Sequence, residues 1–130
     1  MENSRKKKIY LIDDEEIHLA TAELFLKNEY EIYKAKSGRE ALDYINSNKF
    51  APNLILLDIL MPDMDGWEVL KKMKEIAILK NVPIVFLTSV EEQAEQKKAY
   101  KMGIADYIVK PYNMMELKSR IKYLIKKYET

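Results

Sequence analysis

The chain has 130 residues, of which 48% are hydrophobic, enough for one domain with a single core and too few for two. Its 22 basic and 21 acidic residues leave a net charge of +1, so it lacks the positive field typical of a nucleic-acid-binding domain. The absence of cysteine excludes a disulfide framework and a thiolate zinc site.

The first segment, residues 1–8, is polar and basic. It lacks the apolar stretch of a signal peptide, and no later apolar run reaches membrane-spanning length. We therefore expect a soluble, cytoplasmic domain that makes no contact with a membrane.

Short apolar runs then alternate with stretches of helical periodicity, which indicates a parallel sheet with crossover helices. The third and fourth runs are almost wholly apolar and fit central strands, whereas the second alternates with polar residues and fits an edge strand. The five strands are expected at Lys8–Ile12, Glu31–Ala35, Leu54–Leu57, Ile84–Leu87 and Ala105–Val109.

Five helices fit between and after these strands, at Glu16–Asn28, Gly38–Asn46, Gly66–Glu75, Glu91–Met102 and Met114–Tyr128. Three of them carry a capping residue with glutamate three positions later, namely Ser37 with Glu40, Ser89 with Glu92 and Asn113 with Glu116. Right-handed crossovers then predict a single α/β domain over residues 1–130. Its doubly wound, flavodoxin-like parallel sheet has the strand order 2-1-3-4-5.

Acidic residues directly follow two of the predicted strands. Asp13 and Asp14 come after the first strand, and Asp58 comes after the third. These side chains are expected to meet at the carboxyl edge of the sheet, at its switch point. Crowded carboxylates repel one another unless a cation joins them. A hard divalent ion with oxygen ligands, Mg²⁺ (or Mn²⁺), is the natural occupant.

Thr88 ends the fourth strand and Lys110 follows the fifth, so both lie at the same edge as the acids. With these residues in place, the chain from about Lys7 to Tyr128 resembles the receiver domain of two-component response regulators. The matching marks are Asp13-Asp14, Asp58 within Leu57–Gly66, Thr88-Ser89, and Tyr107 three residues before Lys110-Pro111.

The resemblance implies that Asp58 accepts a phosphoryl group from a sensor histidine kinase, a phosphotransfer protein or a small phosphodonor. It implies a metal held by Asp13, Asp14 and Asp58, with the backbone carbonyl of Leu60 as a further ligand. The domain would be a signalling module that catalyses only its own phosphorylation and dephosphorylation, and not a conventional enzyme.

The same resemblance assigns Lys110 and Thr88 to the phosphate, as an ammonium and a hydroxyl donor. Once Thr88 is drawn inward, the ring of Tyr107 would turn into the space it leaves. That movement would alter the surface of the fourth helix, fifth strand and fifth helix, where a partner or a second copy binds. A cis peptide before Pro111 is also implied, which would aim the lysine.

Each of these residues also has a plain structural explanation. Asp13 can cap a helix, Thr88 can end a strand, and Lys110 can lie along a turn proline. Their convergence on one edge favours the functional interpretation, while Tyr107 stays open between a packed ring and a switch. We interpret His18, the only histidine, as a solvated helix residue, because no second histidine or cysteine accompanies it.

Two positions beside the predicted site are apolar. Leu60 stands two residues after Asp58, and Val90 stands two residues after Thr88. Neither side chain can hydrogen-bond a water molecule that attacks the phosphoryl group. We therefore predict slow self-dephosphorylation.

The sequence ends just after the fifth predicted helix, so we expect a stand-alone receiver or a fragment of a larger regulator. That helix is similar to its counterpart in the winged-helix transcription-factor subfamily, and we hypothesise that Asp106 and Arg120 pair across a two-fold dimer. Its other basic residues form a solvated face. No direct binding of nucleic acid by this chain is expected.

Three alternatives remain open. A phosphatase with an aspartyl nucleophile would need an Asp-x-Asp motif and a substrate-binding cap, whereas the first strand here ends in Asp13-Asp14. A flavin- or nucleotide-binding module would need a Gly-, Ser- or Thr-rich loop at that point, and the chain has four acidic residues, 13–16. A pseudo-receiver that only binds partners is disfavoured, because every phosphorylation residue is present.

Overall fold

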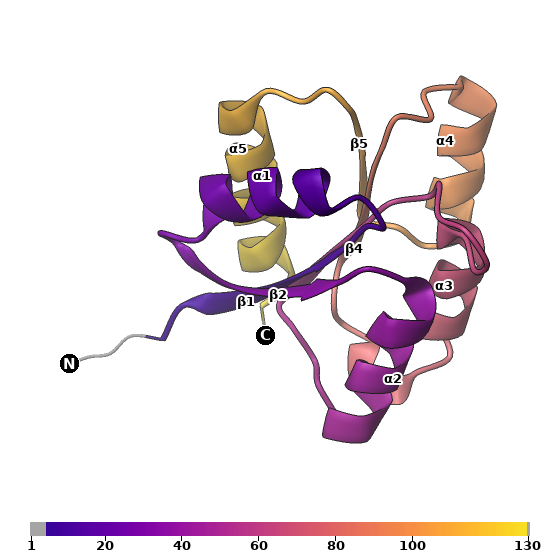
Figure 1. The fold of residues 1–130 in the computed structure, drawn as a ribbon, viewed down its shortest axis with the longest axis horizontal. Coiled ribbons are helices and arrows are strands. Elements are labelled where there is room, and N and C mark those ends of the chain that lie inside the picture. The colour runs from indigo at the N-terminus through magenta and orange to yellow at the C-terminus, as the bar shows by residue number, and fades with distance from the viewer. Residues whose placement is uncertain (1–4, 130) are drawn as a thin grey trace.

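Five parallel strands form one sheet through the middle of the molecule, in the order β2-β1-β3-β4-β5 (Figure 1). The computed structural model describes residues 5–129. The strands are β1 (Lys7–Ile12), β2 (Tyr30–Ala35), β3 (Leu54–Leu57), β4 (Ile84–Thr88) and β5 (Asp106–Val109). The predicted strand order and the edge position of the second strand are confirmed.

The helices cover both faces of this sheet. They are α1 (Glu16–Leu26), α2 (Gly38–Asn48), α3 (Gly66–Met73), α4 (Gln93–Lys101) and α5 (Met114–Tyr128), with a 3₁₀ turn η1 (Ala77–Leu79). Figure 1 shows α1 and α5 on one side and α2, α3 and α4 on the other. The predicted flavodoxin-like fold is therefore confirmed.

The two central strands are apolar along their whole length because both of their faces are covered. All four residues of β3 are buried. Ile55 and Leu57 pack into the cluster beneath α2, α3 and α4, whereas Leu54 and Leu56 pack into the cluster beneath α1 and α5. This alternation fixes the register of β3, and it thereby fixes where the strand ends.

Two of the three predicted caps are confirmed. The hydroxyl of Ser37 accepts a hydrogen bond from the Glu40 N–H at 3.0 Å, and the side chain of Asn113 accepts one from the Glu116 N–H at 3.0 Å. Each cap satisfies a backbone donor that the first turn of a helix leaves free. The α5 helix begins and ends where the sequence predicts.

The predicted cap at Ser89 is wrong. Helix α4 begins at Gln93, and its flanking residue is Glu92, which makes no side-chain cap. The segment after β4 is bound to β5 instead, because the hydroxyl of Tyr107 donates to the Val90 carbonyl at 2.6 Å. A tertiary hydrogen bond thus keeps this segment extended and delays the start of the helix by two residues relative to the prediction.

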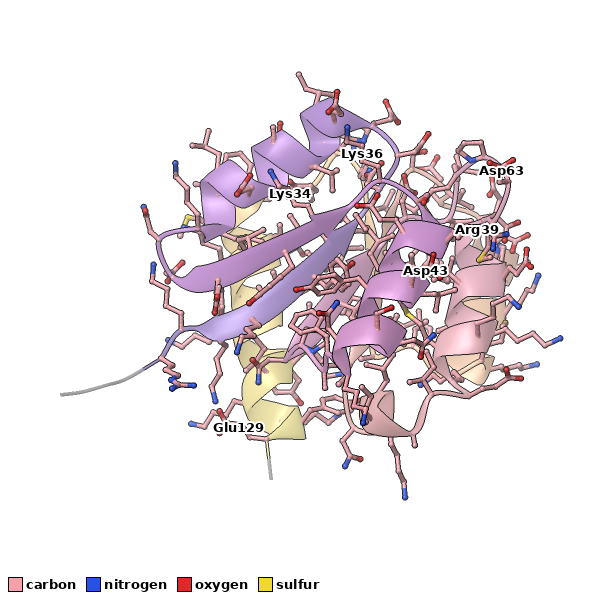
Figure 2. All side chains as sticks on the ribbon, turned by 60° about the horizontal axis from the view of Figure 1, so that its bottom comes forward. Lys34, Lys36, Arg39, Asp43, Asp63 and Glu129 are labelled. Atoms are coloured by element: carbon pink, nitrogen blue, oxygen red, sulfur yellow. The ribbon has the colours of Figure 1, made fainter. Side chains whose placement is uncertain are left out.

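Ion pairs tie α1 to the edge of the sheet. Lys34 in β2 contacts Glu23 at 2.7 Å, and Lys36 contacts Glu16 at 2.8 Å; both lysines lie beside α1 in Figure 2. Such exposed pairs contribute at most about 1 kcal/mol each, so the apolar face of α1 supplies most of its attachment. Within residues 5–129, the structure contains no helix long and apolar enough to cross a bilayer.

Candidate functional site

The predicted site residues lie where the strands end. The Asp58 N–H donates to the Ile12 carbonyl at 3.0 Å, and the Lys110 N–H donates to the Thr88 carbonyl at 2.8 Å. These bonds extend the parallel ladder by one residue at each position. The side chains of Asp58 and Lys110 are therefore placed by the sheet itself and not by a free loop.

The three carboxylates come together as predicted. Oxygens of Asp13, Asp14 and Asp58 all lie within 4.8 Å of one another, and Asp13 and Asp58 are only 7% and 5% exposed. One oxygen of Asp14 is buried and has no hydrogen-bond partner among the described residues. A buried oxygen without a donor, beside two further carboxylates, fits a hard divalent cation such as Mg²⁺ or Mn²⁺.

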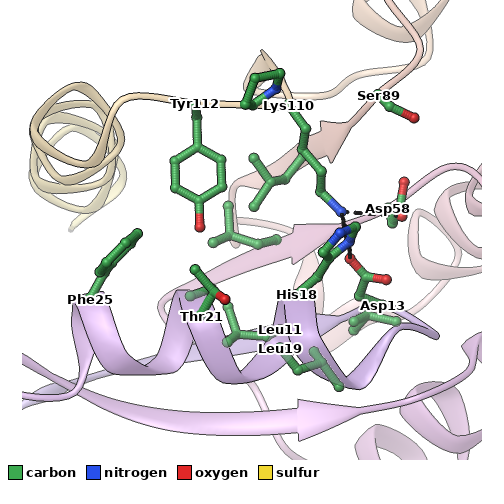
Figure 3. Close-up of a pocket in the computed structure, with 15 residues that line it drawn as sticks. Leu11, Asp13, His18, Leu19, Thr21, Phe25, Asp58, Ser89, Lys110 and Tyr112 are labelled. Atoms are coloured by element: carbon green, nitrogen blue, oxygen red, sulfur yellow. Dashed lines mark hydrogen bonds and ion pairs between the residues drawn. The ribbon is translucent and has the colours of Figure 1, made fainter.

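The lysine reaches this cluster from β5. The Lys110 ammonium lies 2.7 Å from Asp13 Oδ2 and 3.4 Å from Asp58 Oδ2, as Figure 3 shows. It supplies one positive charge against three carboxylates, so the cluster keeps a negative excess that a cation can neutralise. The predicted cis peptide between Lys110 and Pro111 is confirmed.

The interpretation of His18 as a solvated helix residue is incomplete, because its partly exposed ring also contacts the site. Its Nδ1 lies 2.8 Å from the Lys110 ammonium and 3.5 Å from Asp13 Oδ2. The side chain is 39% exposed, so one edge of the ring faces solvent while the other lines the site. His18 follows Asp14 by four residues and lies in the first turn of α1, but this spacing alone does not reveal the contact with Lys110, which is 92 residues away.

Thr88 and Tyr107 both bind the backbone of Val90. Thr88 is fully buried and its hydroxyl accepts from the Val90 N–H at 3.3 Å, while the Tyr107 hydroxyl donates to the Val90 carbonyl at 2.6 Å. The ring of Tyr107 is 5% exposed and packs edge-to-face against Phe86. Burial, followed by nearby negative charges, raises the pKa of Tyr107 to about 12.

The loop after β3 carries Leu60 beside the acids. Its N–H points to Asp58 Oδ1 at 3.3 Å, which is long for a hydrogen bond. Its side chain is 57% exposed and offers no polar atom to the site. Gly66 closes the same loop, since its N–H donates to the Ile59 carbonyl at 2.8 Å.

A cavity of about 460 Å³ adjoins the acids, between α1 and the loop that follows β5. Its walls are mostly apolar and include Leu19, Phe25 and Tyr112, and Lys110 and His18 stand at its polar end (Figure 3). Phe25 and Tyr112 meet edge-to-face with ring centroids 6.3 Å apart. The carboxylates of Asp13 and Asp58 and the ammonium of Lys110 therefore lie at the mouth of an apolar recess.

The family model of the response regulator receiver domain matches residues 9–122. The chain belongs to this family. Receiver domains are signalling domains of two-component systems. The matched residues include Asp13, Asp14, Asp58, Thr88 and Lys110.

Individual relatives agree with this assignment. The chain is 34% identical over 118 residues to the transcriptional regulatory protein CrdR of Helicobacter pylori, covering 90% of this chain and 54% of CrdR. A putative response regulator from Chloroflexus aurantiacus superposes with a TM-score of 0.86 at 29% identity, covering 94% and 99% of the two chains. The phosphorylated cyanobacterial phytochrome response regulator RcpA superposes with a TM-score of 0.80 at 29% identity, covering 95% and 94%.

The receiver chain spans about half the length of the curated relatives it matches, 54% of CrdR for example.

Proposed function

We propose that residues 1–130 form a single phosphoacceptor domain in which Asp58 takes a phosphoryl group from a sensor histidine kinase or a phosphotransfer protein. The observation that carries this proposal is the cluster of Asp13, Asp14 and Asp58 with one lysine and with one buried carboxylate oxygen that has no partner in the described part of the chain. The phosphorylated state of the similar regulator RcpA supports the same chemistry.

Asp13, Asp14 and Asp58 would hold Mg²⁺ (or Mn²⁺), with the Leu60 carbonyl as a further ligand. When bound, the ion would neutralise the repulsion between these carboxylates and an incoming phosphoryl group. The negative excess of the site supports this assignment, because phosphate cannot approach three carboxylates that only one lysine offsets.

Asp58 acts as the nucleophile. One of its carboxylate oxygens attacks phosphorus, the bond from phosphorus to the donor breaks, and the electron pair leaves with the donor. With phosphohistidine as donor, the leaving group is the imidazole of the kinase. The Lys110 ammonium then has a phosphoryl oxygen within reach of its present position, 3.4 Å from Asp58 Oδ2, and Thr88 adds a hydroxyl.

The chain would catalyse only its own phosphorylation and dephosphorylation. Reversal by hydrolysis needs a water molecule directed at phosphorus, and Leu60, two residues after Asp58, has an exposed side chain. Val90, the other flanking residue, is also apolar. Neither side chain can accept or donate a hydrogen bond, so the acyl phosphate is long-lived.

Phosphorylation would reach the surface through Val90. When the Thr88 hydroxyl turns to the phosphoryl group, it gives up the Val90 N–H, which it accepts at 3.3 Å in this structure. The same peptide segment presents the carbonyl that Tyr107 holds at 2.6 Å. Movement at Thr88 therefore changes the position of Tyr107 and with it the surface of α4, β5 and α5.

That surface is the proposed output, for a partner or for a second copy of the chain. Arg120 contacts Asp106 within the same chain at 3.2 Å, and the hydroxyl of Tyr100 donates to the same carboxylate at 3.1 Å. A two-fold dimer would exchange the Arg120 contact between chains, with little net gain per pair. Such pairs would define the register of the dimer more than its affinity.

The test is intact-mass analysis after incubation with Mg²⁺ and acetyl phosphate or phosphoramidate. We expect a gain of one phosphoryl group in the wild-type chain, none with EDTA, and none in Asp58→Asn. A phosphoryl group retained by Asp58→Asn would refute the assignment of the acceptor. No gain from either donor in folded protein that binds Mg²⁺ would indicate a pseudo-receiver or a strict requirement for the kinase, and a purified histidine kinase would decide between them.

A further inference from the structure

Lys110 has one acceptor for each of its three ammonium protons. They are Asp13 Oδ2 at 2.7 Å, His18 Nδ1 at 2.8 Å and Asp58 Oδ2 at 3.4 Å. The first two distances are short, while the third is at the limit of a hydrogen bond. The ammonium is therefore held by Asp13 and His18, and it stands beside Asp58 without closing on it (Figure 3).

The contact fixes the state of the histidine ring. An ammonium group only donates, so His18 Nδ1 must be the unprotonated acceptor and Nε2 must carry the proton. In this role the ring offers Lys110 an acceptor without adding a carboxylate to the site. A carboxylate in its place would increase the negative excess of the site, and a lysine there would repel Lys110.

We propose that His18 is a positioning residue for Lys110, an inference that rests on the function proposed above. His18 acts through the lysine and takes no part in bond making. Its importance rises when Asp13 serves a divalent cation, because the carboxylate oxygen that holds Lys110 then shares its electron density with the ion. His18 Nδ1 is the remaining short contact that keeps the ammonium in place.

A lysine needs such a contact at this position. Its four-carbon stem is flexible, and holding it in one geometry costs conformational entropy. The Lys110 side chain is only 12% exposed, so water satisfies it poorly. Without His18, the ammonium keeps Asp13 Oδ2 at 2.7 Å and would move closer than its present 3.4 Å to Asp58 Oδ2. A tighter ion pair with the carboxylate that must attack phosphorus would lower the reactivity of the nucleophile.

The experiment compares His18→Ala with His18→Asn. The amide oxygen of asparagine lies at the same number of bonds from Cβ as Nδ1, so this variant restores the acceptor, whereas alanine removes it. At saturating phosphoramidate and Mg²⁺, we expect the maximal phosphorylation rate of His18→Ala to fall about tenfold and that of His18→Asn to stay near wild type. The Kd for Mg²⁺, from calorimetry, should be unchanged within about twofold in both.

A second measurement does not depend on phosphorylation. In ¹H–¹⁵N spectra at low temperature, only hydrogen-bonded lysine ammonium groups exchange with water slowly enough to be seen, and Lys110→Arg identifies the signal. We expect this signal in wild type and His18→Asn and its loss in His18→Ala. Thr21→Ala is the matched control on the same helix, because its hydroxyl donates to the Ile17 carbonyl of α1 and to no other group within residues 5–129.

The outcomes separate the two proposals. A wild-type chain that takes no phosphoryl group from either small donor or from a purified histidine kinase refutes the proposed function, while the ammonium signal still tests His18. If the wild type is phosphorylated and His18→Ala matches it in rate and signal, the positioning role is wrong. If His18→Asn is as slow as His18→Ala, the ring acts by shape and not as an acceptor, which also overturns the proposal.

Discussion

Replacing Asp58 with asparagine is expected to stabilise the metal-free protein. The carboxylate of Asp58 lies within 4.8 Å of those of Asp13 and Asp14, and each repulsion at that distance amounts to about 3.5 kcal/mol at an effective dielectric constant near 20. Lys110, 3.4 Å away, returns about 5 kcal/mol of attraction by the same law. Removing the charge of Asp58 therefore relieves about 2 kcal/mol of net repulsion.

Solvent screening reduces that gain, because Asp14 is only half-buried. We expect Asp58→Asn to raise the free energy of unfolding by about 1 to 2 kcal/mol in EDTA, which corresponds to about 4 to 8 °C in Tm for a chain of this size. Excess Mg²⁺ should reverse the order, since an ion at a hundred times its Kd adds about 2.7 kcal/mol to the protein that binds it. The variant would lack one of the three proposed ligands.

The assay is thermal unfolding of both proteins in EDTA and in Mg²⁺. Asp43→Asn is the control, because Asp43 is exposed on α2 (Figure 2) and its replacement should change stability by less than about 0.5 kcal/mol. A less stable Asp58→Asn protein in EDTA would refute the reasoning. It would mean that the carboxylates of the site do not repel one another appreciably in the folded state.

Three further predictions concern the loop, the ring and the phosphorylated form. Gly66→Ala should lower the free energy of unfolding by about 2 to 3 kcal/mol in urea, because a Cβ there comes within 2.6 Å of Ile59 Cα; wild-type stability would contradict this. Tyr107→Phe should lower the free energy of unfolding by about 1 kcal/mol. Because the pKa of Tyr107 is raised to about 12, the wild type should keep this advantage in full below about pH 10 and lose it as the pH rises to 12. The phosphorylated chain should last minutes or longer by intact mass, and Leu60→Asn should shorten that lifetime; decay within seconds would count against this view.

Much of the fold follows from the sequence because central strands need apolar residues on both faces. The boundaries of β3 are those predicted, since Leu54–Leu57 are all apolar and a residue with a charge follows at once. The error at Ser89 has the opposite cause. A cap motif involves only four consecutive residues. The start of α4 depends instead on the hydrogen bond from Tyr107 to Val90, which joins residues 17 positions apart.

The convergence of the acids and the lysine could be predicted because strand ends fix backbone position. The side chain of His18 could not, since its contact with Lys110 spans 92 residues and depends on how closely α1 lies against the loop after β5. Charge still limits what can stand there. Three carboxylates and one ammonium leave a negative excess, so a further acidic group would add repulsion, and a basic group would displace the lysine. A polar residue that satisfies a buried ammonium at this position must be a neutral acceptor, and histidine is one whose ring also reaches from the first turn of a helix to the edge of the sheet.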